Sequence, residues 1–501
     1  MNNKKKSSAA TGEYGRVVKF LGLLGGAQVL ALLMNLLRNK LSSKILGTIG
    51  FGFIGLYSRT VQMFSDFTNL SLSYSAVRKL SEVYENSSSQ EVEHYVKVTR
   101  SLALLTGIVG MLLFMVFSPF VMSAVSDGTE FSVWYLLLLS PTVLFMAVSG
   151  GELAVMRGVR RINSLAIYTL WTAFSGLLVA LPMYYFMGVA GILPSILLIA
   201  FLQMAGVLFH TIKLFGYKVA PFSMRLLRDG ADMIKLGAGY IYTTMLVSFT
   251  AWAIYTMVSD IGGDSELGLF SSGYLLLSML PSVLFAASDS EYYPRLSGAF
   301  GDLKVRNAMV NEQIEVHSLV QTPVILSVVL LLPFLMPLLY TNEYAPAVVM
   351  TQIAMFGLLF HVLTYPMSFM ALSKGDVMVF ILQETVFNVV NMLLIFVGYS
   401  KWGLAGAGVA LLLARIIDFA VSFSVTYFRY GFRLSYCSKK YFVLNMVLAM
   451  LLFCAQFYMH GIMMWVFSLL SVGCSIALSV YFLARYGDVF NKILKRLKLK
   501  R

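Results

Sequence analysis

The chain has 501 residues, of which 58% are hydrophobic and only 12% are charged. An average soluble domain carries about 25% charged residues, and a single soluble core cannot bury an apolar excess of this size. In a soluble protein the net charge of +14 would suggest nucleic-acid binding. Here the basic residues follow a membrane-topology pattern, so we expect no nucleic-acid partner.

The apolar residues form long runs, and three of these carry no charge: Ser101–Val125, Leu236–Val258 and Val324–Tyr340. A helix needs about 20 such residues to cross a bilayer, and runs this continuous do not alternate as barrel strands do. The sequence therefore predicts an all-α polytopic membrane protein with about 14 transmembrane helices. In chain order these are Val17–Leu46, Gly47–Ala76, Ser101–Val125, Phe131–Met156, Asn163–Tyr185, Met187–Ile212, Leu236–Val258, Gly268–Ser290, His317–Tyr340, Pro346–Leu372, Val377–Tyr399, Trp402–Phe428, Tyr441–His460 and Ile462–Arg485.

Lysine and arginine gather in both tails and in alternate loops, whereas the opposite loops Ser126–Glu130, Asp260–Leu267 and Thr341–Ala345 have none. The positive-inside rule then places both termini in the cytoplasm. The predicted organisation is a disordered tail (1–15), a six-helix bundle (16–212), a cytoplasmic linker (213–235), a second six-helix bundle (236–430), two extra transmembrane helices (441–486) and a basic cytoplasmic tail (487–501).

The two predicted bundles are related by an internal repeat. A shift of 216 residues places Gly47 on Gly263 and Gly52 on Gly268, and a shift of 215 places Gly188 on Gly403. Each match is weak alone, but their order and nearly constant offset indicate a duplication. A unit of six spans inserts the same way up twice, so we expect parallel repeats. This arrangement suits a transporter that rocks around a central cavity; a static scaffold is the alternative.

Three ordered stretches resemble motifs of the multidrug/oligosaccharidyl-lipid/polysaccharide (MOP) exporter superfamily, and most closely those of its polysaccharide flippase branch. They are Lys44–Gly52 (KILGTIGFG), Tyr293–Ser297 (YPRLS) and Leu339–Ala347 (LYTNEYAPA). The resemblance extends over residues 14–430. It implies a flippase that moves a polyprenyl-pyrophosphate-linked oligosaccharide, such as an O-antigen or capsule repeat unit, across a bacterial inner membrane.

The same resemblance implies the partners: the lipid-linked oligosaccharide, membrane lipid, and a polysaccharide polymerase with its chain-length proteins. Two alternatives share the fold, namely a cation-coupled multidrug exporter and a lipid II flippase. A membrane-embedded polysaccharide polymerase is a third, but the chain lacks the large outer loop that would hold an acceptor.

Four cations are candidates for substrate binding. Arg38, Lys40 and Lys44 depart from the positive-inside pattern, and Arg59 lies within the second predicted span. If the first span ends near residue 37, the first three face outside; if it is long and tilted, they line a cavity. The resemblance favours the cavity, because the lipid II flippases have a similarly spaced arginine pair. Arginine can bind a pyrophosphate through two parallel hydrogen bonds.

Charged groups within a span are costly and usually have a function. Asp66 lies seven residues after Arg59, on the same helix face, and is a candidate partner or proton site. The other candidates for H⁺ or Na⁺ coupling, or for structural ion pairs, are Glu152, Glu384, Arg415 and Asp418. The last two are three residues apart and can pair directly.

The sequence contains no Walker A loop, no G-x-S-x-G and no H-E-x-x-H motif. We therefore expect neither an enzyme nor a bound cofactor. An ion gradient, or consumption of the flipped product, would supply any energy that transport needs.

Overall fold

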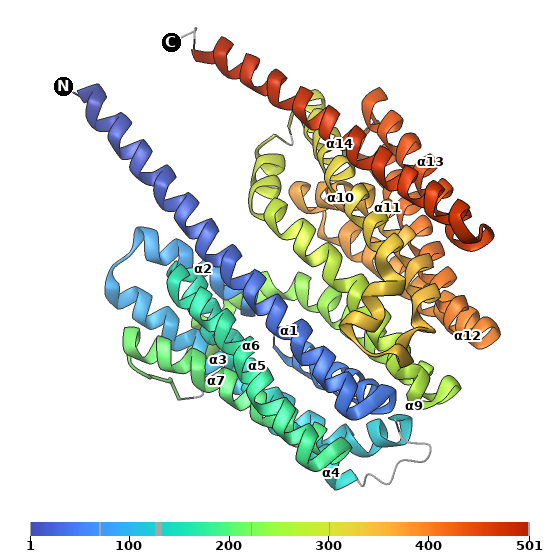
Figure 1. Cartoon of the computed structure of the whole chain (residues 1–501). Coiled ribbons are helices and arrows are strands. Elements are labelled where there is room, and N and C mark those ends of the chain that lie inside the picture. The colour runs from blue at the N-terminus through green and yellow to red at the C-terminus, as the bar shows by residue number, and fades with distance from the viewer. Residues whose placement is uncertain (1, 70–71, 126–132, 222, 300, 499–501) are drawn as a thin grey trace. The chain divides into compact units, whose positions relative to one another are not determined.

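A computed structural model describes residues 2–69, 72–125, 133–221, 223–299 and 301–498, and within these ranges the chain is helical throughout its regular structure (Figure 1). The helices are α1 (Asn2–Thr68), α2 (Leu72–Asn86), α3 (Ser89–Val125), α4 (Val133–Leu137), α5 (Ser140–Gly158), α6 (Ile162–Met187), α7 (Ile192–Phe215), α8 (Met224–Asp229), α9 (Ala231–Gly298), α10 (Leu303–Leu339), α11 (Ala347–Lys374), α12 (Val377–Tyr430), α13 (Tyr436–Tyr458) and α14 (Gly461–Lys498), with short 3₁₀ turns at Gly188–Gly191 and Asn342–Tyr344.

The chain is a multi-pass membrane protein. Eight helices in the described part of the chain are long and apolar enough to cross a membrane. Three of these are far longer than one crossing requires: Ile241–Pro281 has 41 residues, Asn163–Phe215 has 53 and Val377–Tyr430 has 54. About 20 residues suffice for one span, so each of the three is long enough for two. The all-helical prediction is confirmed, and the count of 14 stays a prediction.

The chain divides into two compact units. The first unit comprises residues 1–268 with 339–341, and the second comprises 269–338 with 342–501. Helix α9 contributes to both. Helix α1 begins at Asn2, within the segment 1–15 for which the sequence predicted a disordered tail; this division of the chain stays a prediction. The tail contains Lys4–Lys6 and two alanines, residues that favour helix and can extend the helix that follows.

The long helices break at glycines whose backbone lies in the left-handed region. α1 breaks at Gly47 (φ 66°, ψ −165°) and α9 breaks at Gly263 (φ 78°, ψ 173°), which lies 216 residues later. Gly188 (φ 57°, ψ −136°) ends α6, and Gly403 (φ 57°, ψ −143°) interrupts α12 at an offset of 215. A residue with a Cβ rarely adopts such angles. The same backbone conformation therefore recurs at the spacing found in the sequence.

Within the first unit, the second half of α1 packs antiparallel against the first half of α9. The hydroxyls of Thr48 and Ser265 lie 2.8 Å apart. A Cβ on Gly268 would lie 1.9 Å from the carbonyl oxygen of Thr48, and one on Gly52 would lie 2.8 Å from that of Asp264. The absence of side chains at these two glycines lets the helices approach at backbone distance. We call this contact the α1–α9 seam.

Each unit has its own packed interior. In the first unit, α2, α3 and α5 share a core built around Leu80, Leu102 and Val155, all fully buried. In the second unit α11 is the central helix, because 83% of its most apolar window is buried, against 22–39% for α10, α12, α13 and α14. Gly408 of α12 lies directly on the backbone of Met350 in α11. These interiors hold the polar side chains considered next.

Candidate functional site

Arg38 lies on α1, nine residues before the break at Gly47, and is half-buried in the first unit. Its guanidinium packs on Gly176 of α6, where a Cβ would lie only 2.8 Å from Nη1 of the arginine. The phenol of Tyr184 is near enough to interact with Arg38 electrostatically. Gly176 therefore makes the room that Arg38 occupies, and the guanidinium packs against α6.

The two lysines that follow have different surroundings. Lys40 donates from Nζ to the carbonyl oxygen of Tyr340, the residue directly after α10. The ring of Tyr340 also contacts Phe51 edge to face, with centroids 5.3 Å apart. Lys44 is exposed. Lys40 thus helps to hold the chain around Tyr340, whereas Lys44 is accessible.

Arg59 and Asp66 both lie on the part of α1 that forms the α1–α9 seam. The guanidinium carbon of Arg59 lies 5.5 Å from the ring centroid of Tyr255 on α9, within range for a cation–π interaction. The Asp66 carboxylate accepts hydrogen bonds from Gln62 Nε2 at 2.9 Å and from the hydroxyl of Ser248 on α9. Asp66 is therefore satisfied by these two neighbours, and the seam brings together one cation and one acid from the sequence prediction.

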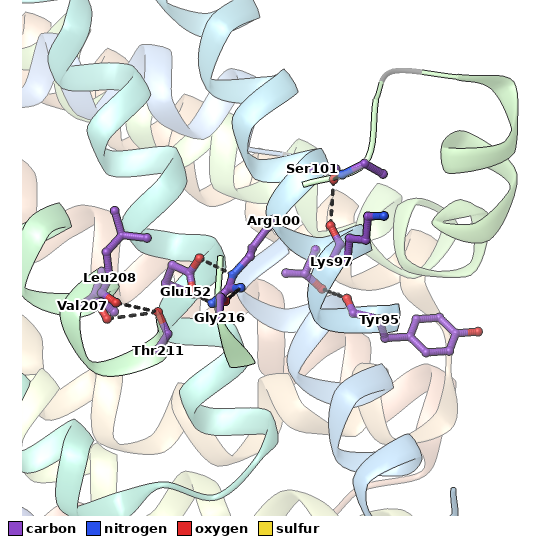
Figure 2. A network of polar contacts seen from close by, with 11 residues as sticks. Tyr95, Lys97, Arg100, Ser101, Glu152, Val207, Leu208, Thr211 and Gly216 are labelled. Carbon is purple, nitrogen blue, oxygen red and sulfur yellow. Dashed lines mark hydrogen bonds and ion pairs between the residues drawn. The ribbon is translucent and has the colours of Figure 1, made fainter. Parts of the chain in front are cut away.

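Glu152 of α5 forms a buried ion pair with Arg100 of α3 (Figure 2). Nε of Arg100 lies 2.7 Å from Oε1 and Nη2 lies 3.2 Å from Oε2, and both side chains are only 2% exposed. Arg100 also donates to the carbonyl oxygen of Gly216, at the end of α7. Arg100 thus links α3 both to α5 and to the end of α7. No partner for Glu152 could be predicted from the sequence, because Arg100 is 52 residues away along the chain.

A pocket of about 200 Å³ in the second unit brings together three of the predicted residues, namely Glu384, Arg415 and Asp418. The nearest oxygen of Asp418 lies 3.4 Å from Nη1 of Arg415. The same Nη1 lies 3.1 Å from Nδ1 of His361 on α11. The complete lining is His361, Thr364, Tyr365, Ser368, Phe380, Gln383, Glu384, Phe387, Arg415, Asp418 and Ser422. We call this the α11–α12 pocket.

Arg415 is held on several sides within this pocket. Its guanidinium carbon lies 4.5 Å from the ring centroid of Phe387, and its stem packs on Gly357 of α11, where a Cβ would lie 3.2 Å from Cγ. In the part of the chain that the structure describes, the Glu384 carboxylate has no hydrogen-bond or ion-pair partner. The pocket therefore contains two acids and one arginine, and Glu384 is the acid left to bind a cation or a proton.

Sequence reasoning did not identify His361, Phe387, Gly176 or Gly357. A histidine and a phenylalanine in apolar spans look like ordinary filler. The two glycines become notable only because each packs against a candidate arginine from another helix. No local pattern reports such a long-range contact.

The fold is similar to that of solved membrane transporters. Lipid II flippase MurJ, in an inward closed conformation, superposes with a TM-score of 0.69 at 15% identity, over 93% of this chain and 99% of that one. An inward-facing multidrug resistance MATE family transporter of the MOP superfamily gives 0.67 at 12% identity, over 82% and 96%. A MOP superfamily transporter from Pyrococcus furiosus gives 0.58 at 13% identity, over 82% and 96%. At these identities the likeness establishes the fold, which is that of the MOP superfamily.

The fold is thus one that solved transporters of the MOP superfamily share, and a family model adds to this finding. The family model for polysaccharide biosynthesis proteins matches residues 17–300, more than half of the chain. The chain therefore belongs to the polysaccharide biosynthesis protein family, as its sequence motifs predicted. No curated protein matches the sequence at a significant level.

Proposed function

We propose that this protein moves a polyprenyl-pyrophosphate-linked oligosaccharide, of the O-antigen or capsule type, from the inner to the outer leaflet of the bacterial cytoplasmic membrane. The observation that carries the proposal is Arg38, an arginine enclosed against Gly176 inside a helical transporter of the polysaccharide biosynthesis family. A charge at the centre of a spanning helix costs about 2.5–3.5 kcal/mol on insertion scales. Binding of an anionic substrate would explain why a cation is placed there despite this cost.

A pyrophosphate needs several hydrogen-bond donors with positive charge. Arg38 and Arg59 each offer a planar guanidinium, and an arginine can bind phosphate oxygens with two parallel hydrogen bonds. Lys44 adds an accessible amine at the end of the same helix segment. Lys40, which already donates to Tyr340, contributes charge and helps to position the chain there. The proposed substrate site therefore depends chiefly on the two arginines.

The proposed mechanism is alternating access by two parallel six-helix repeats with two further helices, 14 spans in all, and both termini in the cytoplasm. The recurring glycine breaks at Gly47 and Gly263, and at Gly188 and Gly403, support the duplication. Helix lengths support it as well: α3 and α10 both have 37 residues. The sugar would cross within the protein while the polyprenyl tail stays in lipid.

We further propose that the α11–α12 pocket couples transport to H⁺ or Na⁺ through Glu384 and Asp418. Glu384 has a carboxylate with no partner in the described residues, whereas Asp66 and Glu152 are already satisfied. This observation also favours the second candidate function, a cation-coupled exporter of small molecules. The basic groups on α1 distinguish the two functions, because a cationic drug would be repelled by them.

The test is complementation of cells that lack the gene, with surface polysaccharide as the readout. Arg38→Ala and Arg59→Ala are expected to abolish surface polysaccharide while the protein stays in the membrane at its normal level. Arg38→Lys, which keeps the charge but loses the planar fork, should retain part of the activity. Lys401→Ala, at an exposed lysine of the second unit, is the matched control. Normal polysaccharide in both arginine variants would refute the cationic site.

A further inference from the structure

A second pocket, of about 230 Å³, lies between the first turns of α3 and the end of α7. Its charged lining comes from both sides: Lys97 and Arg100 from α3, and Lys218 from the segment after α7. The complete lining is Gln90, Glu93, His94, Val96, Lys97, Arg100, Phe215 and Lys218. None of the residues proposed for substrate binding or coupling lines it.

The level of this pocket in the bilayer follows from where the apolar parts of its two helices end. The charge-free run of α3 begins at Ser101, directly after Arg100, and α7 has no charged residue before Lys213. Both apolar stretches therefore end at the pocket. Where the apolar part of a spanning helix ends, the bilayer changes from hydrocarbon to head groups. The pocket is thus at the level of the lipid phosphates.

The lining carries an excess of positive charge. Arg100 is matched by Glu152, and Lys218 lies 3.6 Å from Glu93, the one acid of the lining. Lys97 has no acidic partner among the described residues. The bonds of Arg100 to Glu152 and Gly216 use three of the five N–H groups of a guanidinium. Donors and net charge are therefore available for an anion.

The pocket walls are fixed in place. Arg100 donates to the carbonyl oxygen of Gly216 (Figure 2). The backbone N–H of Ala220 donates to Ser101 Oγ at 2.8 Å, so the segment after α7 is bound to α3 at two points. Val96 and Phe215 add an apolar wall beside the cations. A preformed site with both basic and apolar sides suits a ligand that has a phosphate and a hydrocarbon part.

From the position of this pocket, its positive charge and its fixed walls, we infer that it binds the phosphate group of a membrane lipid. The ligand is either an anionic phospholipid or a polyprenyl phosphate, both of which present a phosphate at this depth. The inference concerns lipid binding at one face of the first unit and does not depend on which substrate is transported.

The test uses the purified full-length protein and native mass spectrometry to count retained lipid. Dioleoyl phosphatidylglycerol, undecaprenyl phosphate and dioleoyl phosphatidylcholine are added in separate arms, and inorganic phosphate is added as a competitor. The pocket variant is Lys97→Ala with Lys218→Ala. The matched control is Lys213→Ala, which removes a nearby lysine that packs on Phe209 outside the pocket lining.

We expect the double variant to bind anionic lipid about 30-fold more weakly, roughly fivefold for each lysine removed, while Lys213→Ala binds as the unaltered protein does. Retention of phosphatidylglycerol in preference to undecaprenyl phosphate would identify a phospholipid site, and the reverse would identify a polyprenyl site; either supports the inference. Equal retention by all variants, equal retention of phosphatidylcholine, or full displacement by millimolar inorganic phosphate would overturn it. A failed polysaccharide assay would leave this result unaffected.

Discussion

Arg100 and Glu152 show how a counter-ion compensates the burial of a charged side chain. Removing an ion from water costs several kcal/mol, and a partner with good geometry recovers that cost. Both side chains are 2% exposed and two N···O contacts join them. The pair between Arg160 and Glu85 is the opposite case, with side chains 62% and 50% exposed. Water screens such a surface pair, so it contributes little.

The first prediction compares these two pairs. Glu152→Ala leaves the Arg100 guanidinium buried without its counter-ion, and we expect the free energy of unfolding to fall by about 3–5 kcal/mol. Glu85→Ala should change it by less than about 1 kcal/mol. Thermal unfolding of the purified protein in detergent measures both. If Glu152→Ala were as stable as Glu85→Ala, the buried pair would not hold α3 to α5.

Asp376, in the loop between α11 and α12, gives a prediction about pH. Burial opposes its charged form and raises the pKa, but hydrogen bonds from Tyr430, Arg429 and Lys374 outweigh this and hold the pKa below its ordinary value. The folded pKa is therefore lower than the unfolded one. The stabilisation is complete above the unfolded pKa of about 3.9 and is lost as the pH falls through the folded pKa.

Asp376→Asn should accordingly lower the unfolding temperature at pH 7 and lower it less at pH 2.5, because the stabilisation is lost progressively below the unfolded pKa of about 3.9 as the pH falls through the folded pKa. The shift at pH 7 should be small, because Asp376 lies at the surface of the loop and its ion pairs are partly exposed. An equal shift at both pH values would show that the carboxylate charge plays no part.

For single side chains, the sequence predicts only contacts between residues that are close along the chain. The i, i+3 spacing of Arg415 and Asp418 indicated a direct pair, and the two groups lie 3.4 Å apart. Other contacts join residues from different helices, as Glu152 does with Arg100 and Arg38 does with Gly176. Such contacts depend on how helices pack, and a single sequence contains no direct record of them.

At the scale of helices, the apolar runs were informative because membrane spans are long and strongly patterned. The structure differs mainly in how the runs join: residues 162–215 and 377–430 are nearly continuous helix with a break at one glycine turn. The sequence predicted short loops just before these glycines, at residue 186 and at residues 400–401. A glycine with positive φ can change the direction of a helix without a long loop. The observed helices are therefore more continuous than the predicted pairs of spans.

Close helix contacts through glycine lead to the third prediction. A Cβ on Gly408 of α12 would lie 2.6 Å from the carbonyl oxygen and 2.9 Å from the Cα of Met350 on α11. Because these are backbone atoms, no side-chain rotation can relieve the clash. Gly408→Ala should destabilise the protein by about 1–3 kcal/mol. Gly473→Ala on α14, where a Cβ meets nothing within 4 Å, should be neutral or slightly stabilising. Equal unfolding temperatures for the two variants would contradict this packing.

At the scale of the whole chain, observations at several levels support the proposed duplication. The offset of about 215 residues came from short sequence matches, and it recurs in the glycine breaks and in the helix ends, since α6 with α7 covers 162–215 and α12 covers 377–430. Glycines that must adopt positive φ are constrained by geometry, so they remain matched after the surrounding residues diverge. The relation between the two copies could therefore be predicted from sequence, whereas their internal contacts could not.

The fourth prediction concerns how often the chain crosses the membrane. An α-helix of 54 residues, the length of α12, is about 80 Å long, whereas the hydrocarbon core is about 30 Å thick. One crossing would leave much apolar surface in water, so α12 should cross twice and turn at Gly403. The residues before and after α12 should then lie on the same side, with Lys401 on the other.

Single cysteines in a variant without Cys437, Cys454 and Cys474 can test this topology. Lys374, Lys401 and Arg433 are all exposed, so each position is accessible to a reagent. A membrane-impermeant maleimide should label Lys401→Cys in intact spheroplasts, and should label Lys374→Cys and Arg433→Cys only after lysis, because the positive-inside rule places these two in the cytoplasm. Labelling of Lys374→Cys and Arg433→Cys from opposite sides would mean that α12 crosses once. The total of 14 spans would then fail, and with it the parallel orientation of the two repeats.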